Sequence, residues 1–203
     1  MDAEGRAPAQ TDPAAASESS TTPKGIGKTT LIHKASEALK STGTPIDGFY
    51  TEEVRQGGRR IGFDVVTLSG KHGILSRIGA SQSDGRREYT VGQYVVDISS
   101  FEHLALPILD CMLKSGNLAQ KSVCVTDEIG KMELFSQKFI SVVHKVLDSA
   151  NAVVFGTIPV PKGKPLPLVE EIRHRQDVKV FNITKENRDA MLQEIVTTVR
   201  NCI

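Results

Sequence analysis

The chain has 203 residues, of which 39% are hydrophobic and 24% charged, and 25 Lys and Arg against 24 Asp and Glu leave a formal net charge of +1. This length suits one globular domain, and the near-neutral balance argues against a nucleic-acid-binding protein, which relies on a large positive field. No apolar run reaches the ~18 residues of a membrane span, and the acidic start MDAEGRAPAQ is not typical of a secretory signal. We therefore expect a cytoplasmic monomer with neither membrane nor nucleic-acid partners.

Residues 1–22 form a segment of different composition from the rest. They contain Ala, Ser, Thr, Pro and acidic residues, but no Val, Ile, Leu or aromatic residue. Such a segment buries too little apolar surface to offset the entropy lost on ordering it. The sequence predicts a disordered segment over 1–22 and a folded domain over 23–203.

The first half of the domain combines one helix with several strands. Apolar residues at helical spacing after Lys28 predict a helix that Gly43 ends. Next come strands at 46–54 and 60–68, joined by a hairpin turn at Gly57 and Gly58. Two further strands are expected at 74–78 and 89–97, with a Gly- and Ser-rich loop at 79–86 between them. A helix is expected at 99–114, and Pro107 should kink or restart it.

From residue 122 onward, short apolar strands alternate with helices. The expected strands are 122–128, 152–158 and 178–183, and the expected helices are 132–149, 166–174 and 184–200, the last with Thr184 as its N-cap. Alternation of this kind is typical of parallel strands joined by crossover helices. The prediction is an α/β fold: a three-layer sandwich around a mostly parallel sheet that carries an antiparallel β-hairpin insertion.

A glycine-rich run leads directly into the first helix, with the sequence GIGKTT over residues 25–30. In a phosphate-binding loop, glycines let successive backbone N–H groups face the phosphates, and the positive end of the helix adds to the attraction. Lys28 would then contact the β- and γ-phosphates, and the Thr29 hydroxyl would bind Mg²⁺. By itself the run also fits an ordinary glycine-rich helix start with a solvated lysine.

A second motif strengthens the phosphate-binding interpretation. The apolar strand ahead of Asp127 and Glu128 has the order of a Walker B motif. Asp127 would then join Thr29 in holding Mg²⁺, and Glu128 would orient or deprotonate the attacking water. Lys28 and Glu128 are therefore the candidate catalytic residues.

From Pro23 to about Thr198 the chain resembles the small thermophile-type P-loop NTPase family. The stretches that carry the resemblance are GIGKTTLIHKASE, DGFYTEEVRQGGRRIGFDVVTLSG, VGQYVVD, DEIGKMELFS, GTIPVPKGKPLPLVEEIR and KVFNITKENR. The resemblance implies a P-loop NTPase fold and Mg²⁺-dependent hydrolysis of nucleoside 5′-triphosphates to diphosphate and phosphate, with low base selectivity. It places the nucleotide-binding residues on two stretches: Thr22, Pro23, Lys24, Gly25, Ile26, Gly27, Lys28 and Thr29, then Val123, Cys124, Val125, Thr126, Asp127, Glu128, Ile129 and Gly130.

One departure from the family pattern precedes the glycine-rich run. The first glycine of the family pattern falls on Thr22, and the residues before it read AAASESST where an apolar first strand is expected. We therefore expect residues 1–22 to be foreign to the fold, and stability and nucleotide affinity to be reduced. Two other functions stay open: a non-catalytic nucleotide-binding or interaction protein, and a small nucleotide kinase, although the arginine-rich lid typical of such kinases is missing.

Three arginines flank the predicted hairpin turn. They are Arg55, Arg59 and Arg60. Either one of them contacts the γ-phosphate, or all three are charges that keep an exposed sheet edge soluble. Sequence alone does not choose between these roles.

Overall fold

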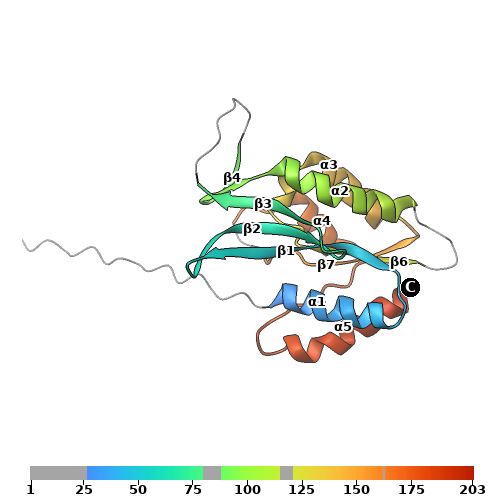
Figure 1. Ribbon diagram of the computed structural model, residues 1–203. Coiled ribbons are helices and arrows are strands. Elements are labelled where there is room, and N and C mark those ends of the chain that lie inside the picture. Colours follow the sequence, from blue (N-terminus) through green and yellow to red (C-terminus); the bar gives the residue numbers. More distant parts are fainter. Residues whose placement is uncertain (1–26, 80–87, 115–120, 162) are drawn as a thin grey trace, which may run out of the picture.

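The computed structural model describes residues 27–79, 88–114, 121–161 and 163–203. They form one seven-stranded sheet with helices on both faces (Figure 1). The helices are α1 (Lys28–Ser41), α2 (Ile98–Lys114), the 3₁₀ turn η1 (Glu133–Phe135), α3 (Gln137–Leu147), α4 (Pro167–His174) and α5 (Arg188–Cys202). The strands are β1 (Ile46–Gln56), β2 (Arg59–Thr67), β3 (His72–Ile78), β4 (Tyr89–Val91), β5 (Tyr94–Val96), β6 (Ser122–Asp127) and β7 (Ala152–Gly156). The predicted disorder of 1–22 lies outside the described residues, as does most of the predicted loop at 79–86.

The sheet has a parallel part and an antiparallel part. Its strand order is β4-β5-β3-β2-β1-β6-β7, and β1, β6 and β7 pair in parallel. The remaining pairs are antiparallel, beginning with the β1–β2 hairpin, whose turn holds Gly57 and Gly58 at φ +56° and +76°. Positive φ is the region that glycine tolerates without strain, so the turn has the residues it requires. The predicted α/β fold with an antiparallel hairpin is confirmed, but the sheet is mixed rather than mostly parallel, because the antiparallel part continues from the hairpin through β3, β5 and β4.

Two apolar cores lie on opposite faces of the sheet. Helices α2 and α3 cover one face, and α1 and α5 pack together on the other (Figure 1). On the α2–α3 side, Phe49, Phe101 and Phe139 are fully buried and meet edge to face, with ring centroids 5.1–6.1 Å apart. On the α1–α5 side, Leu39 and Val125 are fully buried. Strand β6 contributes to both cores, so it is covered on both faces, as its continuous apolar run predicts.

Three predicted elements differ in detail from the structure. The strand expected at 89–97 is two short strands, because Gly92 turns the chain at φ +59°. The helix expected from residue 132 begins at Gln137, where the Ser136 hydroxyl caps it by accepting from the Phe139 N–H at 3.0 Å. Pro107 lies inside α2, which continues through it as a single helix.

The prediction of a strand at 178–183 is wrong. This segment joins no strand ladder, and β7 is the last strand of the sheet among the described residues. The physical reason is a cavity of about 470 Å³ that separates the segment from β7. No helix in the described ranges has the length and apolar character needed to cross a membrane.

The start of the last helix was also predicted too early. Helix α5 begins at Arg188, and Thr184 is part of the turn before it. There the Thr184 N–H donates to the Asn187 side chain at 2.8 Å, and the Asn187 N–H donates to the Thr184 hydroxyl at 3.3 Å. These reciprocal bonds have the pattern of a capping box, and the Arg188 N–H also donates to the Thr184 carbonyl at 3.2 Å. Thr184 therefore caps the turn that leads into α5, although the helix itself begins four residues later than predicted.

Candidate functional site

The two residues predicted to be catalytic meet at the carboxyl end of β6. The Lys28 Nζ, at the start of α1, donates to Glu128 Oε2 at 3.2 Å and to the Ile158 carbonyl at 3.3 Å. Lys28 and Glu128 are one hundred residues apart in the chain. The site therefore lies where parallel strands end and a helix begins, which is the crevice in which open α/β sheets bind ligands.

Asp127 supplies a buried carboxylate beside this pair. It is 1% exposed, and its Oδ1 accepts a hydrogen bond from the Thr157 hydroxyl just beyond β7. Its Oδ2 is buried without a hydrogen-bond partner. A buried carboxylate oxygen left unpaired is costly unless a cation or donor reaches it, so Asp127 fits the role of a metal ligand.

Thr29 is the second residue of α1 and is half-buried at the helix start, next to Lys28 in the chain. In the described ranges no group of three or more His, Cys, Asp or Glu side chains is arranged to enclose a metal. One hydroxyl and one carboxylate suit Mg²⁺ best, because this ion usually takes few protein ligands and completes its shell with water and phosphate oxygens.

Gly27 holds the entry to α1 in a conformation that favours glycine. Its φ is +92°, and a Cβ built on it would lie 2.8 Å from Nη1 of Arg188, the first residue of α5. The positive φ selects glycine here, whereas the Arg188 guanidinium is the flexible end of a side chain that could move aside. Sequence reasoning did not identify Arg188 as part of the site, although it ends the stretch KVFNITKENR.

Glu133 is a second site residue that sequence reasoning missed. It is 4% exposed, and its Oε2 accepts from the Gly130 N–H at 3.1 Å. Burial, together with the charges of Glu128 and Asp127, raises the pKa of Glu133 to about 8. A Cβ on Gly130 would lie 2.8 Å from Glu128 Oε1 and 3.2 Å from Glu133 Oε2, so the two carboxyl groups pack around this glycine.

The other predicted nucleotide-binding residues are placed as follows. Thr22, Pro23, Lys24, Gly25 and Ile26 lie outside the described residues. Val123, Cys124, Val125 and Thr126 are buried in β6, behind the site, and Ile129 is buried just after it. Burial raises the pKa of the Cys124 thiol to about 12, so this side chain is uncharged packing in the core.

Two of the hairpin arginines are held by other groups. Arg55 and Arg60 both bind Glu53, at 2.6 and 2.7 Å, and Arg60 also donates to the Tyr94 hydroxyl at 2.9 Å. Together the two arginines lower the pKa of Glu53. Arg59 is exposed on β2. These contacts are within the hairpin and with β5, which lies beyond β3 in the same sheet, as expected for charges that stabilise a sheet surface.

The fold and this arrangement define a class: an α/β protein of the P-loop type, with a helix-start lysine facing carboxylates at the end of a parallel strand. A family model described as NTPase matches residues 20–196. The chain is 66% identical to the human cancer-related nucleoside-triphosphatase over 184 residues, which cover 89% of this chain and 95% of that protein. It is 43% identical to nucleoside-triphosphatase THEP1 of Thermotoga petrophila, over 87% of this chain and 88% of that protein. The chain belongs to this NTPase family.

Solved structures agree with this assignment. The solution structure of a human cancer-related nucleoside triphosphatase superposes with a TM-score of 0.76 at 65% identity, covering 88% of this chain and 94% of that one. The crystal structure of THEP1 from Aquifex aeolicus superposes with a TM-score of 0.72 at 36% identity, covering 87% of this chain and 94% of that one. The similarity therefore extends over nearly all of each chain.

Proposed function

We propose that the protein hydrolyses nucleoside 5′-triphosphates to the diphosphate and inorganic phosphate. The observation that carries the proposal is the meeting of Lys28 and Glu128 at 3.2 Å, beside the buried Asp127. The names of the relatives support the same reaction, because each is called a nucleoside-triphosphatase. Low base selectivity is part of the same proposal.

The proposed reaction is in-line attack of water on the γ-phosphorus. The water oxygen forms a bond to phosphorus, the bond from phosphorus to the β–γ bridging oxygen breaks, and the nucleoside diphosphate leaves. Glu128 orients the water and takes its proton. Lys28 neutralises charge on the β- and γ-oxygens, together with backbone N–H groups at the start of α1.

Mg²⁺ is proposed as the cofactor, held by the Thr29 hydroxyl and the Asp127 carboxylate. When bound, it supplies positive charge to the phosphate oxygens. The unpaired Oδ2 of Asp127 supports this assignment. The Thr157 hydroxyl, bonded to Oδ1, fixes the orientation of the carboxylate, as groups around a metal ligand commonly do.

Release of phosphate from ATP and GTP, with and without Mg²⁺, tests the proposal. We expect release that needs Mg²⁺, needs no second substrate and is lost in Lys28→Ala. Release that appears only with an added phosphate acceptor would identify a nucleotide kinase instead. Release that persists in Lys28→Ala would mean that another site, or a contaminant, is responsible.

A second candidate is a nucleotide-binding protein with little or no turnover. The cavity beside β7 favours it, because Lys28 lines that cavity and loses packing support there. The two candidates separate in one assay: nucleotide binding by calorimetry without phosphate release favours the second.

A further inference from the structure

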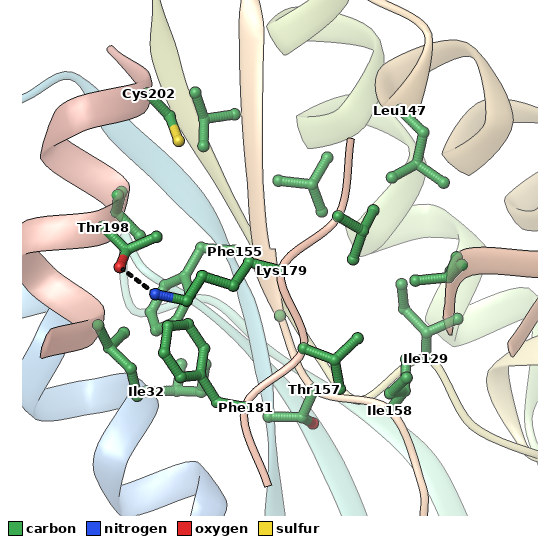
Figure 2. A pocket seen from close by; sticks show the side chains of 18 of the residues that line it. Ile32, Ile129, Leu147, Phe155, Thr157, Ile158, Lys179, Phe181, Thr198 and Cys202 are labelled. Carbon is green, nitrogen blue, oxygen red and sulfur yellow. Dashed lines mark hydrogen bonds between the residues drawn. The ribbon is translucent and has the colours of Figure 1, made fainter. Parts of the chain in front are cut away.

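The cavity beside β7 passes through the plane of the sheet and opens onto both of its apolar cores. Ile129 and Leu147 line it from the α2–α3 side, and Ile32 and Val199 line it from the α1–α5 side. Figure 2 shows Ile129 and Leu147 on one side of the space and Ile32 on the other, with Phe155 and Phe181 on the side of Ile32. A pocket for a small ligand on one face of a sheet would contact only one of these cores.

Two segments of the chain line the cavity from opposite sides. One wall is β7, which pairs with β6 along one edge and with no described strand along the other. The opposite wall is the segment 178–183, which is neither helix nor turn and is outside every described ladder. Strand edges carry unpaired N–H and C=O groups that readily take up a further strand.

We infer that this cavity, the β7 slot, is a binding site for an extended apolar strand supplied by another polypeptide, which continues the ladder from β7. This mode of recognition is β-strand addition, in which the backbone supplies affinity and the side-chain pockets supply selectivity. The inference does not depend on the proposed hydrolysis of nucleotides.

The two apolar faces of the slot define the sequence of the occupant. A strand covered on both faces must be apolar at successive positions rather than at alternate ones. Strand β7 shows the pattern: Ala152 and Val154 pack on one core, and Val153 and Phe155 on the other. The occupant is therefore a run of about five residues rich in Val, Ile or Phe.

The charges that line the slot add a second requirement. The charged side chains that line it are Lys28, Lys121, Lys179 and Asp177. Lys28, Lys179 and Asp177 are already paired with Glu128, Glu194 and Arg175, whereas Lys121 donates only to the Cys202 carbonyl among the contacts of the described residues. The cation left for a partner is therefore the one at Lys121. An acidic residue that flanks the apolar run complements this charge.

The chain's own amino-terminal residues do not meet these requirements. Twenty-six residues precede Gly27, which is long enough to reach the slot, but residues 14–22 read AAASESSTT. A strand drawn from them would bury Glu18 and several hydroxyl groups against apolar walls, at a cost of several kcal/mol for an unpaired carboxylate. An occupant in trans avoids that cost.

A synthetic peptide tests the inference. The probe is the run NAVVFG, taken from residues 151–156, with glutamates at both ends and a fluorescent label. We expect saturable binding to the full-length protein, slower hydrogen exchange of β7 amides, and a Tm rise of about 5–10 °C at a peptide concentration one hundred times Kd. The matched control peptide carries proline in place of its central valine, which prevents ladder pairing and leaves the apolar character.

Two valines provide matched protein variants. Val180 lines the slot and is 45% exposed, whereas Val160 is 58% exposed and does not line it. Val180→Asp should weaken peptide binding at least tenfold, and Val160→Asp should leave it unchanged, while both variants keep the Tm of the free protein within a few degrees.

Three results would overturn the inference. The first is no binding of the valine peptide to the full-length protein, and the second is equal binding of the proline peptide, which would indicate hydrophobic adhesion only. The third is a fall in Tm on deletion of residues 1–22 combined with peptide binding that appears only after the deletion. That third result would show that the chain fills the slot itself.

Discussion

The two flanks of β6 differ sharply in how completely they are packed. On the β1 flank, an 11-residue strand continues into the antiparallel hairpins, and its Phe49 is fully buried among other aromatic rings. On the β7 flank, a five-residue strand is followed by the β7 slot. The site at Asp127 and Glu128 stands at the end of β6, between these flanks. The open flank nevertheless holds part of the site, because Thr157 and Ile158, just beyond β7, bond to Asp127 and Lys28. The comparison teaches that the ends of loosely packed strands can still position polar groups.

The largest expected effect tests whether the site works despite its open flank. Glu128→Gln removes the group that takes the proton of the water but keeps the shape of the side chain. We expect kcat to fall about 10²–10⁴-fold while nucleotide affinity changes little. Phosphate release measured beside calorimetric binding checks this. A loss of affinity as large as the loss of rate would assign Glu128 to binding instead.

Loss of an aromatic ring from each flank measures the packing difference directly. Phe49→Ala should lower the free energy of unfolding by about 3–5 kcal/mol, because it empties a closed core. Phe155→Ala should cost only about 1–2 kcal/mol, because Phe155 is half-buried and already borders the slot. Urea unfolding of both variants measures the two decreases in the free energy of unfolding. Equal decreases would mean that the slot is closed in solution.

The buried Glu133 gives the site a pH dependence of its own. Its pKa in the folded protein, about 8, lies above the ordinary value of 4.5, because burial and the facing charges of Glu128 and Asp127 disfavour the ionised form. Between these values the unfolded chain has lost the proton and the folded protein keeps it, so this group lowers stability as pH rises from about 4.5 to 8.

Glu133→Gln removes this dependence and keeps an acceptor for the Gly130 N–H. The variant should lose less stability than the parent protein between pH 4.5 and 8 when both are unfolded in urea without nucleotide. Parallel stability curves for the two proteins would show that Glu133 is ionised in the folded state.

The smallest effect comes from one added methylene group on each flank. Val199→Ile, at the slot wall, should raise the free energy of unfolding by about 0.5–1 kcal/mol. Val65→Ile, in the closed core of the other flank, should lower it by about 1–3 kcal/mol through overpacking. Thermal unfolding of both variants shows whether the two changes in the free energy of unfolding have opposite signs. Changes of the same sign would contradict the difference in packing between the flanks.

Most of the fold could be predicted because its signals are local. The helical spacing after Lys28 and the Gly57–Gly58 turn each identify an element from a few neighbouring residues. Segment 178–183 has the composition of a strand, but strand formation needs a neighbour at hydrogen-bonding distance, and the slot intervenes. Composition alone does not supply that neighbour.

The site divides in the same way. Lys28 and Glu128 were predicted from motifs and meet in the structure. Glu133 and Arg188 were not, because each reaches the site through a contact that motif spacing does not contain: the Gly130 N–H for Glu133 and the close approach to Gly27 for Arg188.

The contact between Lys28 and Glu128 has a consequence for the nucleotide-free protein. While the ammonium group is paired with Oε2 of Glu128, this oxygen is engaged and is a weaker acceptor for the proton of the water that Glu128 is proposed to activate. Phosphate oxygens that bind Lys28 compete with this carboxylate and set it free. Binding of the nucleotide would thus free the Glu128 carboxylate for catalysis. The same replacement of Glu128 by phosphate at Lys28 would limit nucleotide affinity, because the Lys28–Glu128 ion pair has to break first.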